Sequence, residues 1–207
     1  MSRKVCQHCH FPSNVCLCDV LKPVTSRSAV WVLQHPSETD HGKNSARLLP
    51  LMLDKAQIVV GETSADFAGL QAQIQAQGLA PVLVYPAEAG EAVFTPAANA
   101  PEPENRLLIL LDGTWRKALK MYHLNPWLHT LPKLALSPEK PSAYRIRKAH
   151  RADSLSTLEA AAEALMLLEP QLDVSALFEA FDAMVSRRLA AMPEAVRQRY
   201  LRDESNS

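Results

Sequence analysis

Short apolar runs recur along the chain and predict the strands of a buried sheet. They cover residues 29–33, 58–60, 82–85 and 107–111, and each is followed directly by a polar residue, a glycine or a proline. Runs of this length that are apolar throughout are typical of strands covered on both faces. The run at 107–111, Leu-Leu-Ile-Leu-Leu, is the most apolar, so we expect it to be a central strand.

Helical spacing of apolar residues predicts helices between and after these strands. We expect them over 44–53, 64–77, 114–122, 156–168 and 174–191. Ser156 and Glu159 form a capping box that opens the fourth of them, whereas Pro50 leaves the start of the first open. Residues 86–105 read as a mobile surface connection, and a short strand is expected near 134–136. The alternation predicts an α/β fold with a mainly parallel sheet and helices on both faces.

Length and charge bound the possible functions. At 207 residues the chain is long enough for one α/β domain and a small appendage. Lys+Arg and Asp+Glu balance at 22 each, so the net charge does not indicate a nucleic-acid partner. The segment 140–152 differs, because it has five basic side chains and no acid: Lys140, Arg145, Arg147, Lys148 and Arg151. Such a stretch can hold phosphates, although a solvated surface loop fits it equally well.

No apolar run approaches the roughly 20 residues that cross a bilayer. The N-terminus also lacks the charged-then-apolar pattern of a signal peptide, so we expect a cytoplasmic protein that does not bind a membrane. In a reducing compartment, clustered cysteines are more often metal ligands than disulfides.

The four cysteines of the chain lie within its first 18 residues, as a Cys-x-x-Cys pair and a Cys-x-Cys pair. Two close pairs can supply four thiolates to a tetrahedral zinc with little loss of loop entropy. His8 or His10 could replace one ligand, and a set of free thiols is the alternative. We expect a structural zinc knuckle over residues 1–24, joined to a main domain over 25–207, with the ligands Cys6, Cys9, Cys16 and Cys18.

Asp112, Thr114 and Trp115 follow the most apolar run as Asp-Gly-Thr-Trp. Ligands of open α/β sheets collect outside the carboxyl ends of the strands, so these three side chains are candidate site residues. A structural interpretation competes, because Asp is a common helix N-cap and Trp is often a core residue. Dinucleotide-binding, Walker and Gly-x-Ser-x-Gly motifs do not occur, which leaves those enzyme classes unsupported.

These motifs, in this order, resemble the DTW-domain family, which is named for an Asp-x-Thr-Trp motif. The resemblance covers most of the chain. Besides Asp-Gly-Thr-Trp and the cysteine pairs, it rests on Gln-His-Pro-Ser-Glu at 34–38, Asn-Ser-Ala-Arg-Leu-Leu at 44–49 and Leu-Ser-Thr-Leu-Glu-Ala at 155–160.

The resemblance implies a tRNA-uridine aminocarboxypropyltransferase. Such enzymes move the 3-amino-3-carboxypropyl group of S-adenosylmethionine to N3 of a tRNA uridine and release 5′-methylthioadenosine. The family is similar in fold to SPOUT methyltransferases, which implies a trefoil knot. The resemblance to the DTW-domain family also implies tRNA as partner and a structural Zn²⁺. The oligomeric state stays open, and so does the identity of the uridine.

The resemblance and the chemistry of this transfer together suggest roles for single residues. Asp112 is our candidate general base, and Thr114 and Trp115 lie beside it, with Trp115 packing against the cofactor or the base. A competing view is that Asp112 only holds the loop. The donor would be bound near Ser45, Leu111, Leu134 and Thr157, with Ser45 standing where we expect Thr. The tRNA phosphates would contact Arg116, Lys117, Arg145, Arg147, Lys148 and Arg151.

Two other functions remain as alternatives. One is a SPOUT-like RNA methyltransferase that uses the same cofactor and releases S-adenosylhomocysteine. The other is a noncatalytic, zinc-dependent RNA-binding module, which would not need S-adenosylmethionine.

Overall fold

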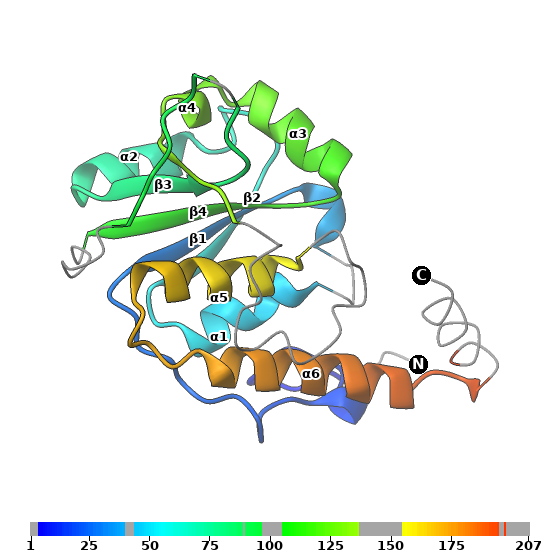
Figure 1. Cartoon of the computed structure of the whole chain (residues 1–207). Helices are drawn as coiled ribbons and strands as arrows, with labels where there is room; N and C mark the ends of the chain where they lie inside the picture. Colours follow the sequence, from blue (N-terminus) through cyan, green and yellow to red (C-terminus); the bar gives the residue numbers. More distant parts are fainter. Residues whose placement is uncertain are drawn as a thin grey trace.

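Five parallel strands form one sheet in the order β2-β1-β4-β3-β5 (Figure 1). The computed structural model describes residues 4–39, 44–88, 90–96, 105–136, 155–194 and 197. The strands are β1 (Ala29–Gln34), β2 (Ala56–Val60), β3 (Ala80–Val84), β4 (Arg106–Asp112) and β5 (Lys133–Leu134). The prediction of an α/β fold with a parallel sheet is confirmed, and the most apolar run is the middle strand.

Helices cover both faces of the sheet because successive strand residues point to opposite sides (Figure 1). Trp31 and Leu33 of β1 face a layer made of α2 (Ala68–Ala76), α3 (Trp115–Leu124) and α4 (Pro126–His129). Val30 and Val32 face the other layer. That layer holds the 3₁₀ turn η3 (Ser45–Leu48), α1 (Leu49–Met52), α5 (Thr157–Leu168) and α6 (Ser175–Ala190).

The helices differ from the sequence predictions at three places. The expected helix over 44–53 is a 3₁₀ turn followed by the short α1, with Pro50 in its first turn, where proline is tolerated. Helix α2 begins at Ala68 rather than near 64, because Asp66 instead accepts the backbone N–H groups of Glu62 and Thr63 in a turn. Helix α4 was not predicted.

The segment after β3 is not only a surface connection. Lys133 of β5 donates its backbone N–H to Ala92 O at 2.8 Å and accepts from Phe94 N at 2.8 Å. Residues 92–94 therefore extend the sheet edge beside β5, and the expectation of a mobile connection is wrong for them.

The N-terminal segment contains the 3₁₀ turn η1 (Ser13–Val15), packs against α6, and contacts η3 through Arg47. Cys9, Phe11 and Leu17 belong to the same buried cluster as the inner faces of α5 and α6. Arg187 of α6 forms a two-pronged ion pair with Asp19, with N–O distances of 2.6 and 2.7 Å. The division into domains at residue 24 stays a prediction. Within the described part of the chain, no helix has the length and apolarity to cross a membrane.

Candidate functional site

Asp112 lies at the carboxyl end of the middle strand, where β1 and β4 run in register. Gln34 is the register partner of Asp112. Gln34 Nε2 donates a 2.8 Å hydrogen bond to Asp112 Oδ2, and the backbone N–H of His35 donates to Asp112 O at 2.9 Å. The sequence analysis did not select Gln34 as a site residue. The available signal was its position: Gln34 ends β1 as Asp112 ends β4, and neighbouring parallel strands end at the same edge of a sheet.

Helix α5 begins at the same edge, and its first two residues contact Asp112 and the predicted residue Ser45. Its first residue, Thr157, donates its hydroxyl to Asp112 Oδ1. Ser45 Oγ accepts the backbone N–H of Leu158 at 3.4 Å. The predicted capping box of Ser156 is confirmed. Because unpaired backbone N–H groups at a helix start favour negative charge, the start of α5 suits the Asp112 carboxylate or an anionic ligand group.

The remaining predicted residues of this edge differ in exposure. Leu134 is buried in β5, whereas Leu111 is half-buried beside Asp112. The N-cap of α3 is Thr114, which makes no side-chain capping bond, so the interpretation of Asp112 as an N-cap is wrong. Trp115 is 60% exposed, so the interpretation of Trp115 as a core residue is wrong as well.

The predicted RNA-binding residues are only partly described. Lys117 forms an ion pair with Glu38 of the 3₁₀ turn η2 (Pro36–Glu38), with an N–O distance of 2.9 Å. Arg116 is exposed. The predicted residues Arg145, Arg147, Lys148 and Arg151 lie outside the described residues, as does the rest of the basic segment.

Aromatic side chains gather beside this edge, and sequence reasoning did not single them out. Tyr85 directly follows β3; its ring lies 6.5 Å from that of Trp115, at an interplanar angle of 60°. It also stacks on Tyr122 of α3, at 4.9 Å and 15°. The Tyr122 hydroxyl donates to Glu91 Oε1 at 2.9 Å, and Glu91 forms an ion pair with the buried Lys133. Burial raises the pKa of Tyr85 and of Tyr122.

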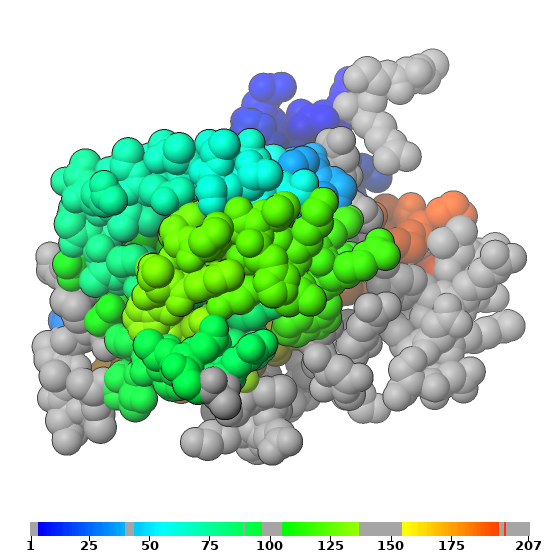
Figure 2. All heavy atoms as spheres, turned by 90° about the horizontal axis from the view of Figure 1, so that it is seen from above, coloured from blue at the N-terminus to red at the C-terminus, as the bar shows by residue number. Residues whose placement is uncertain are grey.

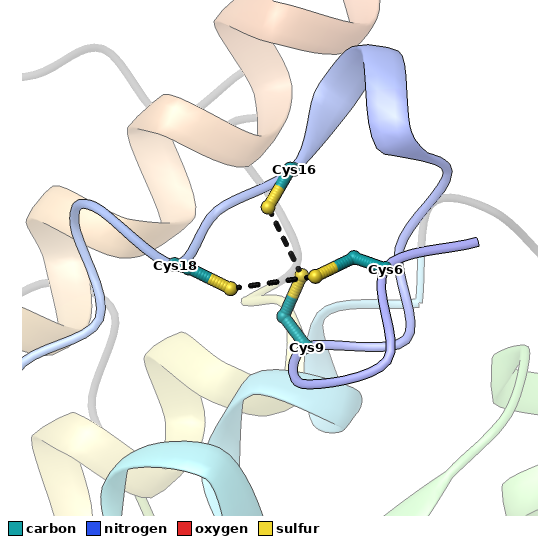
Figure 3. A group of neighbouring side chains, drawn as sticks. All are labelled: Cys6, Cys9, Cys16 and Cys18. Carbon is teal, nitrogen blue, oxygen red and sulfur yellow. Dashed lines mark hydrogen bonds between the residues drawn. The ribbon is translucent and has the colours of Figure 1, made fainter. Parts of the chain in front are cut away.

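The four cysteine sulfurs form a compact group in which all Sγ atoms lie within 4.8 Å of one another (Figure 3). Cys6 Sγ and Cys18 Sγ are 3.5 Å apart, and Cys9 Sγ and Cys16 Sγ are 3.7 Å apart. A zinc tetrahedron with Zn–S bonds of about 2.3 Å has S–S edges of about 3.8 Å. The cysteines are free rather than disulfide-bonded. Neither His8 nor His10 belongs to the group, so the donor set fits a tetrahedral metal ion with four thiolates.

Hydrogen bonds within this group favour thiolate at one position and thiol at another. The backbone N–H groups of Cys9 and His8 lower the pKa of Cys6 to about 6. Hydrogen bonds with Cys16 and Cys6 raise the pKa of Cys18 to about 12. Four adjacent thiolates repel one another, and a divalent cation would remove this repulsion.

The fold and these two sites define an α/β protein with a polar strand edge and a four-cysteine cluster. The DTW domain profile matches residues 3–189, and the chain therefore belongs to the DTW-domain family.

Three curated relatives are each named tRNA-uridine aminocarboxypropyltransferase 2. The Drosophila melanogaster protein is 32% identical over 174 residues, which are 81% of this chain and 67% of the relative. The Mus musculus protein is 29% identical over 172 residues, and the Macaca fascicularis protein 27% over 171; each match covers 81% of this chain. The matches span 57% of each of these two mammalian relatives. No solved structure matches the chain significantly.

Proposed function

We propose that this protein is a tRNA-modifying transferase that moves the 3-amino-3-carboxypropyl group of S-adenosylmethionine to N3 of a tRNA uridine. Membership of the DTW-domain family and the names of the three relatives support the reaction class. The structural observation that carries the proposal is the carboxylate of Asp112, held on one oxygen by Gln34 and on the other by Thr157 at the carboxyl end of the middle strand.

The geometry suits the chemistry that this reaction needs. Uracil N3 carries a proton at neutral pH and is a poor nucleophile until the proton leaves. Asp112 accepts or orients this proton, since each carboxylate oxygen retains a further lone pair beyond the hydrogen bond described. The donor must present its Cγ, rather than its methyl group, in line with the departing sulfur. Ser45, Leu111, Leu134 and Thr157 are the residues to which we assign donor binding.

Two structural features complete the proposal. The four cysteines hold a structural zinc ion, because their donor set and spacing fit one and the module supports α6 and η3. The topology is SPOUT-like and knotted. This part of the proposal rests on the membership of the DTW-domain family and agrees with the all-parallel sheet.

Product analysis with the purified protein tests the reaction. Incubation with tRNA and S-adenosylmethionine should give 3-(3-amino-3-carboxypropyl)uridine and 5′-methylthioadenosine, detected by mass spectrometry of the digested tRNA and of the supernatant. Methylated uridine with S-adenosylhomocysteine would instead establish the methyltransferase alternative. Tight tRNA binding without consumption of S-adenosylmethionine would establish the noncatalytic one.

The variant Asp112→Asn tests the carboxylate. If Asp112 is the base, turnover falls by about 10²-fold or more while the affinity for S-adenosylmethionine is retained. Asp54→Asn is the matched control, because Asp54 is exposed and precedes β2 at the opposite edge of the sheet. Near-normal turnover of Asp112→Asn with intact donor binding would exclude the base role.

A further inference from the structure

Helix α3 exposes an aromatic ring among basic side chains. Trp115 is 60% exposed at its first turn, and Leu119, one turn later, is 46% exposed. The helix carries Arg116, Lys117, Lys120 and His123 but no acidic residue. Lys117 and Lys120 form ion pairs with Glu38 and Glu62, at N–O distances of 2.9 and 2.8 Å, whereas Arg116 beside Trp115 is exposed. It lies open on the face of the molecule that Figure 2 views. A surface that combines an apolar ring with positive charge suits a partner with flat rings and phosphates, which is the chemistry of a nucleic acid.

A second ring lies next to Trp115 and comes from another element. Tyr85 follows β3 and meets the Trp115 ring in a tilted arrangement at 6.5 Å. Aromatic rings at such distances and angles attract each other edge to face, so the two rings orient each other. They therefore offer two adjoining ring surfaces, close to the turn that carries Asp112.

An ion pair between the buried Lys133 and the half-buried Glu91 contacts these rings through Tyr122. Tyr85 stacks at 4.9 Å on Tyr122, whose hydroxyl donates to Glu91. Glu91 also accepts the backbone N–H of Glu88 at 2.8 Å and pairs with Lys133, which is 1% exposed. A buried ammonium is costly without its counter-charge, so Lys133 holds the Glu91 carboxylate in place. Tyr122 is thus fixed, and Tyr85 loses little side-chain entropy when a further ring stacks on it.

We propose that Tyr85 and Trp115 form a stacking site for an unpaired nucleobase of the RNA substrate, with Tyr122, Glu91 and Lys133 as its support. The occupant rests on the proposed function, which makes tRNA the partner. A uridine of a folded tRNA must be unpaired and splayed out before its N3 can react, and proteins hold such bases by stacking. The placement of Trp115 three residues after Asp112 puts this site beside the candidate base.

RNA binding without turnover tests the site. The probes are an RNA hairpin with unpaired uridines in its loop and the same hairpin with abasic loop positions. Trp115→Ala and Tyr85→Ala should each weaken binding of the uridine hairpin about tenfold and leave the abasic hairpin unchanged. Trp115→Phe and Tyr85→Phe keep a ring and should retain most of the affinity. Leu119→Ala is the matched control, because it removes an exposed apolar side chain from the same helix. It should change the affinity for neither hairpin.

Other results would overturn the proposal. An equal loss of affinity for both hairpins would show that the rings contact the RNA backbone. An unchanged affinity for both would show that the rings do not touch RNA. A selective loss of S-adenosylmethionine affinity would assign the rings to the donor, and a change in oligomeric mass would assign them to a second copy of the chain. These readouts need no product, so a failure of the transferase proposal leaves them interpretable.

Discussion

Asp112 is oriented by an amide and a hydroxyl and, among the described residues, pairs with no cationic side chain. This distinction matters because an Arg or Lys partner would compete with a substrate proton for the carboxylate, whereas neutral donors fix its direction. The aromatic residues nearby are fixed differently, by the charged pair of Glu91 and Lys133. The contacts that orient Asp112 are thus separate from those that support the proposed stacking site of Tyr85 and Trp115. Substitutions can therefore test the two groups one at a time.

The hydroxyl of Thr157 is the contact to Asp112 that substitution tests most cleanly. Thr157→Val keeps the shape of the side chain but leaves one oxygen of Asp112 without its donor. We expect a loss of about 1 kcal/mol in the free energy of unfolding. We also expect turnover to fall about tenfold or more, because the carboxylate is no longer fixed. Thr157→Ser restores the hydroxyl and should recover both values. Urea unfolding and single-turnover kinetics measure them, and a Ser variant as impaired as the Val variant would contradict the role of the hydroxyl.

Among the elements, η3 connects the cysteine cluster to the candidate site. Arg47 of η3 donates from Nη2 to His10 O at 2.8 Å, and its guanidinium lies 4.7 Å from the centre of the Phe11 ring. The first residue of the same turn, Ser45, accepts the N–H of Leu158 at the start of α5. His10 has a φ of 58°, a left-handed conformation that few residues other than glycine adopt, so the loop that presents its carbonyl has a defined shape. Loss of the metal should therefore disturb both η3 and the start of α5.

Removal of zinc tests this connection. A chelator should lower the melting temperature. The free energy of unfolding should fall by about 4 kcal/mol if the free zinc concentration before chelation is a thousand times the dissociation constant. Cys9→Ser should give the same result and also weaken S-adenosylmethionine binding, because Ser45 is displaced. His8→Ala is the control, since His8 lies outside the sulfur group and this variant should keep its metal. Elemental analysis measures the zinc content, and thermal unfolding measures the melting temperature. A metal-free protein that melted at the same temperature as the zinc-bound protein would refute the structural role of the zinc ion.

For the whole molecule, the sequence predicts the sheet better than it predicts the site. The unbroken apolar runs of β1 and β4 indicate burial on both faces, and both strands lie inside the sheet rather than at its edges. Lys133 gives no such signal, because a lysine at the start of a two-residue strand has the pattern of a surface residue. Its partner Glu91 lies 42 residues earlier, and only the folded chain brings the two together. Long-range pairs of this kind cannot be found from periodicity, which reports on the neighbours of a residue along one element.

The pH dependence of unfolding gives a measurement of this long-range pair. The backbone N–H of Glu88 and the ammonium of Lys133 lower the pKa of Glu91 to about 2, from an ordinary value of 4.5. A carboxyl whose pKa is lower in the folded state stabilises the protein fully above its unfolded pKa, and this contribution disappears as the pH falls through the folded pKa. The contribution of Glu91 should therefore be complete above about pH 5 and be lost toward about pH 2.

Comparison with Glu91→Gln isolates this contribution from those of Asp19, Glu62 and Asp66, whose pKa values are also lowered. Those carboxyls titrate in both proteins, so they cancel in the difference. In Glu91→Gln, Lys133 stays buried beside a neutral amide, as it does beside protonated Glu91 in acid. The gap between the two urea midpoints should thus be widest near pH 7 and close toward pH 2. Glu88→Gln alters an exposed side chain and should leave the wild-type curve unchanged. A gap that stayed constant with pH would mean that Lys133 and Glu91 contribute through packing rather than through charge.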